Sequence, residues 1–202
     1  PIEIDSSVFS MANYGAEFYN QRVDSLVNEG TGTNYGIELT LEKFFSSNYY
    51  FLVTASLFES KYVASDGVER NTAFNGNFVL NMLGGYEFNL NDRMKLTTSL
   101  KGVWAGGKRN LYLDEVASIL EDEAVYLDAK AYTERETDYF RVDVRLGFKL
   151  QGNKTTQEWA LDLQNLTGHQ NVFSKKYDNI NNEVITNYQQ GFFPMFLYRI
   201  NF

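Results

Sequence analysis

The residues best suited to chemistry are charged side chains that alternate with apolar ones within one segment. In 139–150, Arg141, Asp143, Arg145 and Lys149 are separated by even numbers of positions. Alternate side chains of a β-strand point to the same side of a sheet, so these four share a face. They can contact a passing solute or pair with one another, and cross-strand pairs contribute only about 0.2–1 kcal/mol each. The simplest interpretation is a wall that faces water.

Charged residues at alternate positions recur in other segments, and we predict that they belong to the same wall. The predicted wall residues are Glu38, Glu42, Lys95, Lys101, Arg141, Asp143, Arg145, Asp162 and Arg199. We expect no enzyme, because the chain has one histidine (His169), no cysteine, and no carboxylate pair that stands out from the alternation. We also expect no cofactor and no metal site.

The composition narrows the classes of protein. The chain has 202 residues and a net charge of −8, which disfavours a nucleic-acid partner. The absence of cysteine excludes a disulfide scaffold, and no apolar run approaches the roughly 18–20 residues of a membrane-spanning helix. A membrane β-barrel remains compatible, because its apolar residues occupy alternate positions. The start at Pro1, without Met, favours a mature or trimmed fragment.

The elements that must position these residues are long β-strands. Apolar residues recur with period two in seven segments, which are 35–42, 49–60, 77–88, 94–104, 139–150, 157–166 and 192–202. Most are about 10–12 residues long, whereas strands of soluble proteins have about 5–6 and bilayer-spanning strands about 9–11. Their apolar faces carry no charge between the strand ends. This distribution predicts an all-β, antiparallel segment of a transmembrane β-barrel.

The links between the strands alternate in length, as in outer-membrane barrels with short periplasmic turns and long external loops. The short links are Ser46–Asn48, Asn89–Arg93 and Gln151–Thr156, and the long ones are 61–76, 106–138 and 168–190. Aromatic residues near the strand ends suit the two membrane interfaces. The predicted interface aromatics are Tyr35, Tyr49, Phe88, Trp104 and Trp159.

The long link 106–138 carries an acidic cluster and a helical pattern. Leu113, Val116, Ala117 and Leu120 fall at helical spacing, which predicts a short surface helix. The acidic residues are Asp114, Glu115, Glu121, Asp122, Glu123 and Asp128. They could attract divalent cations at a lipopolysaccharide surface or a cationic ligand, although a run of charges more often forms a solvated face.

Several stretches resemble a known family. They are Asn34–Lys43, Asp66–Gly76, Asp138–Arg145, Leu161–Thr167 with Asn171–Phe173, and Gly191–Phe202. In their order and spacing, the chain from about residue 30 resembles the C-terminal end of a TonB-dependent outer-membrane receptor of the type common in Bacteroidetes. This resemblance implies a 22-stranded barrel closed around an N-terminal plug. It also implies import of a scarce nutrient, such as an iron chelate, haem, cobalamin, a glycan or a peptide, with energy passed through TonB.

The resemblance also implies an organisation and a set of partners. Residues 1–32 would be the end of an earlier strand and an extracellular loop, and 33–202 the C-terminal strands and loops. The chain lacks a plug and has only about seven strands, so transport would require a longer protein in the bacterial outer membrane. The implied partners are outer-membrane lipid and lipopolysaccharide, the plug and TonB through the missing region, the barrel-assembly machinery and the nutrient. The wall residues would then face the lumen or contact the plug.

The last strand has an additional predicted role. Phe196, Tyr198, Ile200 and Phe202 occupy alternate positions up to the C-terminus, a pattern that resembles the signal read by the barrel-assembly machinery. The same pattern also suits a simple lipid-facing strand end. Two other functions stay open, a passive porin-like channel and a soluble β-sandwich binding module, which alternates in the same way.

Overall fold

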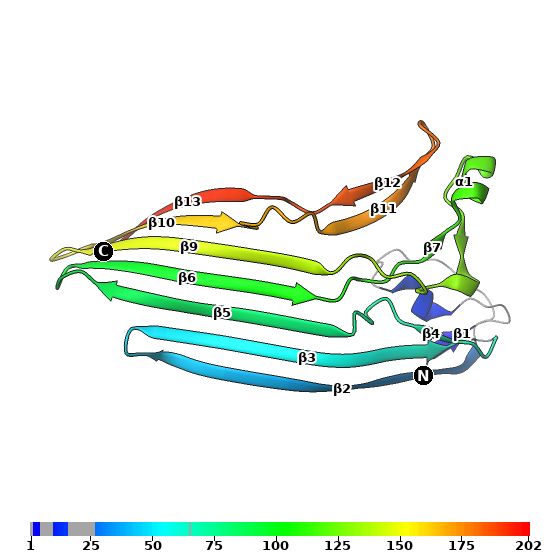
Figure 1. The fold of residues 1–202 in the computed structure, drawn as a ribbon, viewed down its shortest axis with the longest axis horizontal. Coiled ribbons are helices and arrows are strands. Elements are labelled where there is room, and N and C mark those ends of the chain that lie inside the picture. The colour runs from blue at the N-terminus through cyan, green and yellow to red at the C-terminus, as the bar shows by residue number, and fades with distance from the viewer. Residues whose placement is uncertain (1, 5–9, 16–26, 65) are drawn as a thin grey trace.

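Most of the chain forms one antiparallel sheet. The computed structural model describes residues 2–4, 10–15, 27–64 and 66–202. Within them, nine strands form the main sheet in the order β1-β2-β3-β5-β6-β9-β10-β13, with β4 beside β3 (Figure 1). Their bounds are β1 (Ile2–Ile4), β2 (Val27–Ser46), β3 (Tyr49–Val63), β4 (Glu69–Asn71), β5 (Phe78–Asn89), β6 (Met94–Ala105), β9 (Tyr139–Gln151), β10 (Thr156–Gln164) and β13 (Phe193–Asn201). The predicted all-β, antiparallel architecture is confirmed.

Each of the seven predicted strands is present, and the long strands follow one another across the sheet as they do in the sequence. The link between β2 and β3 is a tight turn, in which Ser47 and Asn48 both have positive φ (53° and 71°). Two successive residues in this conformation form the type I′ turn that suits a twisted hairpin. β2 begins at Val27, so 27–32 extends this strand and the predicted boundary at residue 33 lies within it.

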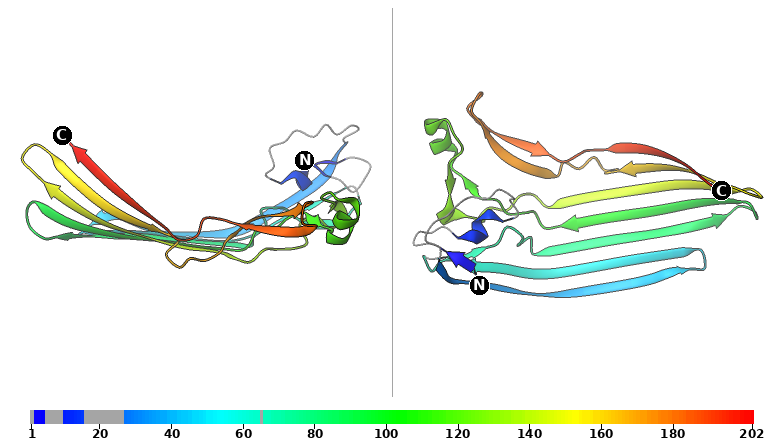
Figure 2. Two further views of the ribbon diagram at one scale, coloured as in Figure 1. Left: turned by 90° about the horizontal axis from the view of Figure 1, so that it is seen from above. Right: turned by 180° about the vertical axis from the view of Figure 1, so that it is seen from behind.

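The sheet is curved and staggered, and it is open within the described residues. Figure 2 shows the curvature. β3 continues to Val63, whereas β5 begins opposite Leu57. A stagger of this kind accompanies strand tilt in barrels. Among the described residues, β2 is covered on its outer edge only by the short β1, and β13 has no outer neighbour.

The long links gather at one end of the sheet, opposite the short turns, as predicted (Figure 1). We call residues 10–15, 61–76, 106–138 and 168–190 the loop cap. It contains η1 (Met11–Tyr14), β7 (Tyr112–Leu113), α1 (Glu115–Glu121), β8 (Tyr126–Leu127), η2 (Asp128–Lys130), β11 (Val172–Asp178) and β12 (Glu183–Tyr188). The predicted surface helix is α1. No helix in the described part of the chain is long and apolar enough to cross a membrane.

The buried apolar cluster lies in the loop cap rather than on the sheet. Its buried members are Tyr62, Ala64, Ala131 and Tyr132. Asn13 joins this cluster to the rest of the cap: it accepts a hydrogen bond from the Tyr62 hydroxyl, and its amide donates to Asp128 Oδ1 (2.7 Å). The Tyr132 hydroxyl donates to the Asn13 carbonyl oxygen (2.6 Å). Segments that are distant in the sequence are therefore held together by the side chain and the main-chain carbonyl of one residue, Asn13.

Candidate functional site

The register of the sheet places all nine predicted wall residues on one side, which we call the polar face. Lys101 lies opposite Asp143, and Arg145 lies opposite Asp162. Glu42 joins the same side through the pairings that run from β2 to β6. The sequence pattern therefore identified which residues share a face, although pairing alone does not say what that face contacts.

Arg145 is the centre of an ion-pair network on the polar face. Its Nη1 lies 2.9 and 3.1 Å from the two carboxylate oxygens of Asp162, and its Nη2 lies 3.2 Å from Glu158 Oε1. The other oxygen of Glu158 lies 3.8 Å from Arg199. Side chains of β9, β10 and β13 are thus joined across the sheet, and each carboxylate has a cation beside it.

A second group on this face fixes the end of β10. Arg141 Nε donates to Asp143 Oδ1 (2.7 Å), and Arg141 Nη2 donates to Gln164 Oε1 (2.9 Å). Asp143 also accepts the backbone N–H of Asn165 (2.8 Å). Because Asn165 begins the link to the β11–β12 hairpin, these charges support the loop cap as well as the wall.

The remaining predicted wall residues are less closely connected. Lys95 forms an ion pair with Glu87 (2.7 Å). Glu38, Glu42 and Lys101 share the face but form no ion pair with any described residue. The structure therefore brings Lys95 of β6 and the wall residues of β9, β10 and β13 into local pairs, and leaves Lys101 and the wall residues of β2 without an ion pair among the described residues.

Glu158 and Glu87 also belong to the polar face, and the sequence already places each of them opposite the apolar side of its strand. Glu158 bridges Arg145 and Arg199, although it was not among the predicted wall residues. The signal was present, because Glu158 and Asp162 are separated by an even number of positions within one strand and must share a face.

The polar face is hollowed near the short turns. A pocket of about 440 Å³ crosses the sheet from β2 to β10. Its lining residues are Phe45, Tyr50, Tyr86, Glu87, Thr97, Thr98, Ser99, Arg145, Lys149 and Glu158. Tyr50 packs over the backbone of Gly85, where an added Cβ would lie 2.5 Å from the ring. Hydroxyls, charges and aromatic rings converge there, as in a surface that holds polar material.

In the described ranges, no group of three His, Cys, Asp or Glu side chains is placed to hold a metal ion. His169 lies in the cap, edge-on to the Phe140 ring with centroids 6.0 Å apart. Its Nε2 is buried and has no hydrogen-bond partner among the described residues.

The opposite side of the sheet, which we call the apolar face, is uncovered. Ile37 is 79% exposed there, whereas the Glu158 side chain on the polar face is only 13% exposed. Exposed apolar residues on this face include Ile37, Leu39, Leu41, Leu57, Met82, Leu100, Leu146, Leu161 and Phe196. A contiguous apolar surface of this extent marks contact with another apolar phase or protein.

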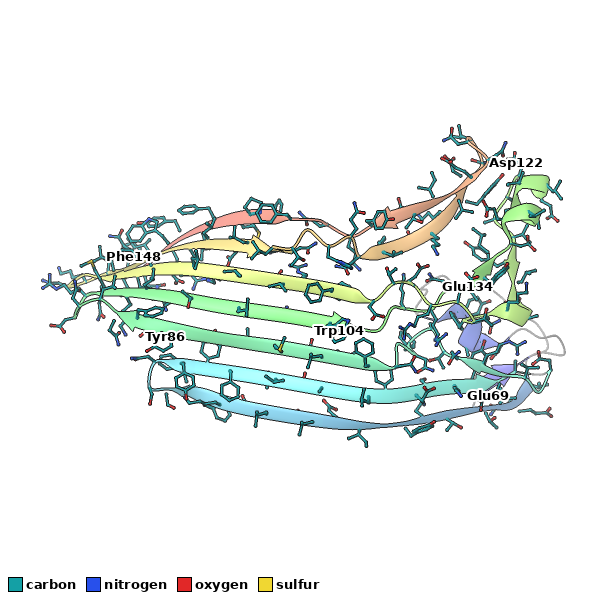
Figure 3. The ribbon with its side chains drawn as sticks, in the orientation of Figure 1. Glu69, Tyr86, Trp104, Asp122, Glu134 and Phe148 are labelled. Carbon is teal, nitrogen blue, oxygen red and sulfur yellow. The ribbon has the colours of Figure 1, made fainter. Side chains whose placement is uncertain are left out.

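Two rows of aromatic residues border the apolar face. Near the cap, Trp104 packs edge-on against Phe78, with centroids 5.1 Å apart. Near the short turns, Trp159 lies between Phe148 (5.8 Å) and Tyr198 (5.5 Å). Figure 3 shows Trp104 toward the cap end of the sheet, with Tyr86 and Phe148 toward the other. The five predicted interface aromatics Tyr35, Tyr49, Phe88, Trp104 and Trp159 all lie on this face.

The distance between the aromatic rows is close to the height of the apolar band of outer-membrane barrels. On β6, Trp104 and Leu96 are separated by eight residues, or about 27 Å at about 3.4 Å per residue, and Leu96 lies opposite Phe88 and Phe148. A strand tilt of about 35–45° reduces this span to about 19–22 Å, near the apolar band of about 25 Å in outer-membrane barrels.

Among the described residues, Lys43 is the one cation on this face below the cap, and its ammonium group is directed to the short-turn edge. Its Nζ donates to the carbonyl oxygens of Ser46 (2.8 Å) and Tyr49 (3.1 Å), and lies 3.6 Å from the Tyr49 ring centroid. A long side chain can in this way place its stem on apolar surface and its charge at a polar boundary.

The predicted assembly residues lie on or next to β13, which has no outer neighbour within the part of the chain that the structure describes. Phe196, Tyr198 and Ile200 project from the apolar face of β13, and Phe202 follows the strand and is exposed. Their role as a signal stays a prediction. Comparisons with protein-family models, with curated proteins and with solved structures found no match to this chain.

Proposed function

We propose that the chain forms the C-terminal part of the wall and the outer mouth of a bacterial outer-membrane β-barrel, as in a TonB-dependent receptor that imports a scarce nutrient. The observation that carries the proposal is the exposed apolar face, which is free of charge between its two aromatic rows. A charged side chain at the bilayer midplane lowers stability by about 2–4 kcal/mol, so a strand face in contact with lipid is expected to carry no charge there.

The other features fit the same arrangement. The ion-paired polar face would line the lumen or contact a plug, and the loop cap would form the mouth on the outer surface. The free edges of β2 and β13 would pair with further strands of a longer chain, because a bilayer does not tolerate unpaired strand edges. The nutrient would be a small molecule or an oligomer that enters through the cap.

In a soluble β-sandwich, a second sheet rather than lipid would cover the apolar face. The two proposals therefore predict different surroundings for a single side chain on that face. The chain contains no cysteine, which allows nitroxide labels at Leu100→Cys and Ser99→Cys, neighbours on opposite faces of β6. In the native protein reconstituted in lipid vesicles, we expect the label at 100 to be accessible to oxygen and the label at 99 to a water-soluble nickel chelate. A label at 100 shielded from both would contradict the membrane wall.

A receptor and a passive channel differ in whether the lumen is blocked. We expect the native protein, purified from outer membranes, to have a mass several times 23.2 kDa and to give no steady conductance in a planar bilayer. A steady open conductance would favour the porin-like channel. A native mass near 23.2 kDa would exclude the 22-stranded receptor.

A further inference from the structure

The helix α1 presents its apolar residues outward. Val116 and Leu120 are 70% and 81% exposed, and Ile119 is also exposed. These residues follow i, i+3, i+4 spacing and therefore form one stripe along the helix. The residue that α1 buries is Ser118. A surface helix normally turns such a stripe toward the core, so α1 has the reverse orientation.

This orientation is fixed by hydrogen bonds at the base of the helix. The Ser118 hydroxyl donates to the Asp114 carbonyl oxygen (2.6 Å) and accepts the backbone N–H of Val125 (3.0 Å). Asp114 caps the helix by accepting the N–H of Ala117 (3.0 Å). Below it, β7 and β8 pair through Tyr112 with Leu127 and Leu113 with Tyr126. The helix follows a short β-ribbon, and rotation of the helix about its axis would break these hydrogen bonds.

The apolar stripe is surrounded by unneutralised negative charge. Residues 114–123 contain five acidic side chains and no basic one, and none of the five forms an ion pair with a described residue. Figure 3 shows Asp122 at the outer end of the cap, near the β11–β12 hairpin. A second copy of the chain would bring like charges together, and phosphate-bearing lipid would be repelled as well.

We propose that α1 is a docking surface for a peptide segment that combines cationic and apolar side chains. Val116, Ile119 and Leu120 would cover the apolar side chains of the peptide, and the carboxylates of 114–123 would pair with its basic groups. Other apolar residues of the cap are exposed as well, such as Phe74 (63%) and Ile180 (86%), but on α1 three of them share one helix face within an acidic segment. The inference concerns the cap alone and does not depend on import.

The test is fluorescence anisotropy with the native full-length protein and a short labelled amphipathic peptide of lysine and leucine. We expect saturable binding that weakens as salt is added, because charges contribute to it. Leu120→Ser should weaken binding about tenfold, since the loss of one buried leucine contact is of that size. Glu121→Gln with Glu123→Gln should weaken binding and reduce its dependence on salt.

Val68→Ser is the matched control, because Val68 is an exposed apolar residue of the cap in a different loop. It should leave binding unchanged, and circular dichroism should show that every variant is folded. Equal binding by Leu120→Ser, or equal binding of a peptide with glutamate in place of lysine, would overturn the proposal. Binding that requires lipopolysaccharide and Mg²⁺ and is lost with a chelator would also overturn it, in favour of a cation-bridged lipid contact.

Discussion

Tyr62 and Trp104 are large aromatic residues on strands of the same sheet, yet Tyr62 is 1% exposed and Trp104 is 47% exposed. Tyr62 lies where β3 extends into the loop cap, and Trp104 lies on the apolar face of β6. The cap encloses Tyr62 and Tyr132 around a polar centre at Asn13. The large aromatic residues of the apolar face, such as Trp104, are left exposed. One chain therefore contains a cap with a buried centre and a sheet face whose large apolar side chains no described residue covers.

The difference also appears in the polar groups. In the cap, Arg70 is buried, and its guanidinium donates to both oxygens of Asp66 and to the carbonyl oxygen of Ala129. Buried polar groups are stable only when they are satisfied in this way. On the sheet, the ion-paired charges lie on the polar face, whereas the apolar face carries Lys43, whose ammonium group is directed to the short-turn edge. The polar groups of Arg70 are thus paired within the cap, whereas the apolar face exposes large apolar side chains.

The most direct test of the difference between the cap and the sheet is to place a charge on the apolar face. Met82 lies between the aromatic rows, and its neighbour Asn81 lies on the polar face. We expect Met82→Lys to cost about 2–4 kcal/mol and Asn81→Lys to have little effect, because only the first charge would enter lipid. The measurement is urea unfolding of the native protein in lipid vesicles, followed by its heat-modifiable migration on gels. Equal effects of the two substitutions would contradict a lipid-facing side.

The second prediction tests whether the cap is closed by its own contacts. Asn13→Ala removes the partner of the Tyr62 hydroxyl and the donor to Asp128. A buried polar group left unpaired costs about 1–3 kcal/mol, so hydrogen exchange should accelerate in the cap but not in the sheet. Asn187→Ala is the control, since Asn187 is exposed and makes only a long bond to Ser174. Acceleration throughout the sheet would show that the two regions are one unit.

The third prediction uses acid to loosen the cap selectively. The Arg70 guanidinium lowers the pKa of Asp66 below its usual range. The stabilisation from this ion pair is fully present above the unfolded-state pKa of about 3.9, and it is lost as the pH falls through the lower pKa of the folded state. Limited proteolysis should therefore cut the cap faster below about pH 4. Arg70→Gln should remove this dependence on pH, and a variant that keeps it would assign the effect to another carboxylate.

The sequence allowed the sheet to be predicted more fully than the cap, for a physical reason. Strand alternation is local, so Phe140, Val142 and Val144 reveal their strand and their shared face without knowledge of any partner. The stagger of β3 beyond β5 and the start of β2 at Val27 were not predicted, because they depend on pairing across strands.

The centre of the cap had no sequence signal of this kind. Asn13 and Asp128 are 115 positions apart, and no periodic pattern connects them. The helix α1 was predicted from its spacing, but spacing alone does not say that Val116 and Leu120 face outward. The ion pairs on the polar face were predictable in part. Alternation predicted which residues share the face, but the pairing of Glu158 with both Arg145 and Arg199 depends on the register between strands, which the sequence does not reveal.

The last prediction concerns the polar face, where charged side chains are paired as in the cap but remain in contact with water. Arg199 is more than half exposed and lies 3.8 Å from Glu158, so Arg199→Gln should change the free energy of unfolding by less than about 1 kcal/mol. Arg145→Gln removes contacts with both Asp162 and Glu158 and should cost more. Urea unfolding of both variants in vesicles gives the comparison. If Arg199→Gln were as costly as Asn13→Ala, the polar face would be closed from water in the native protein by material packed against it.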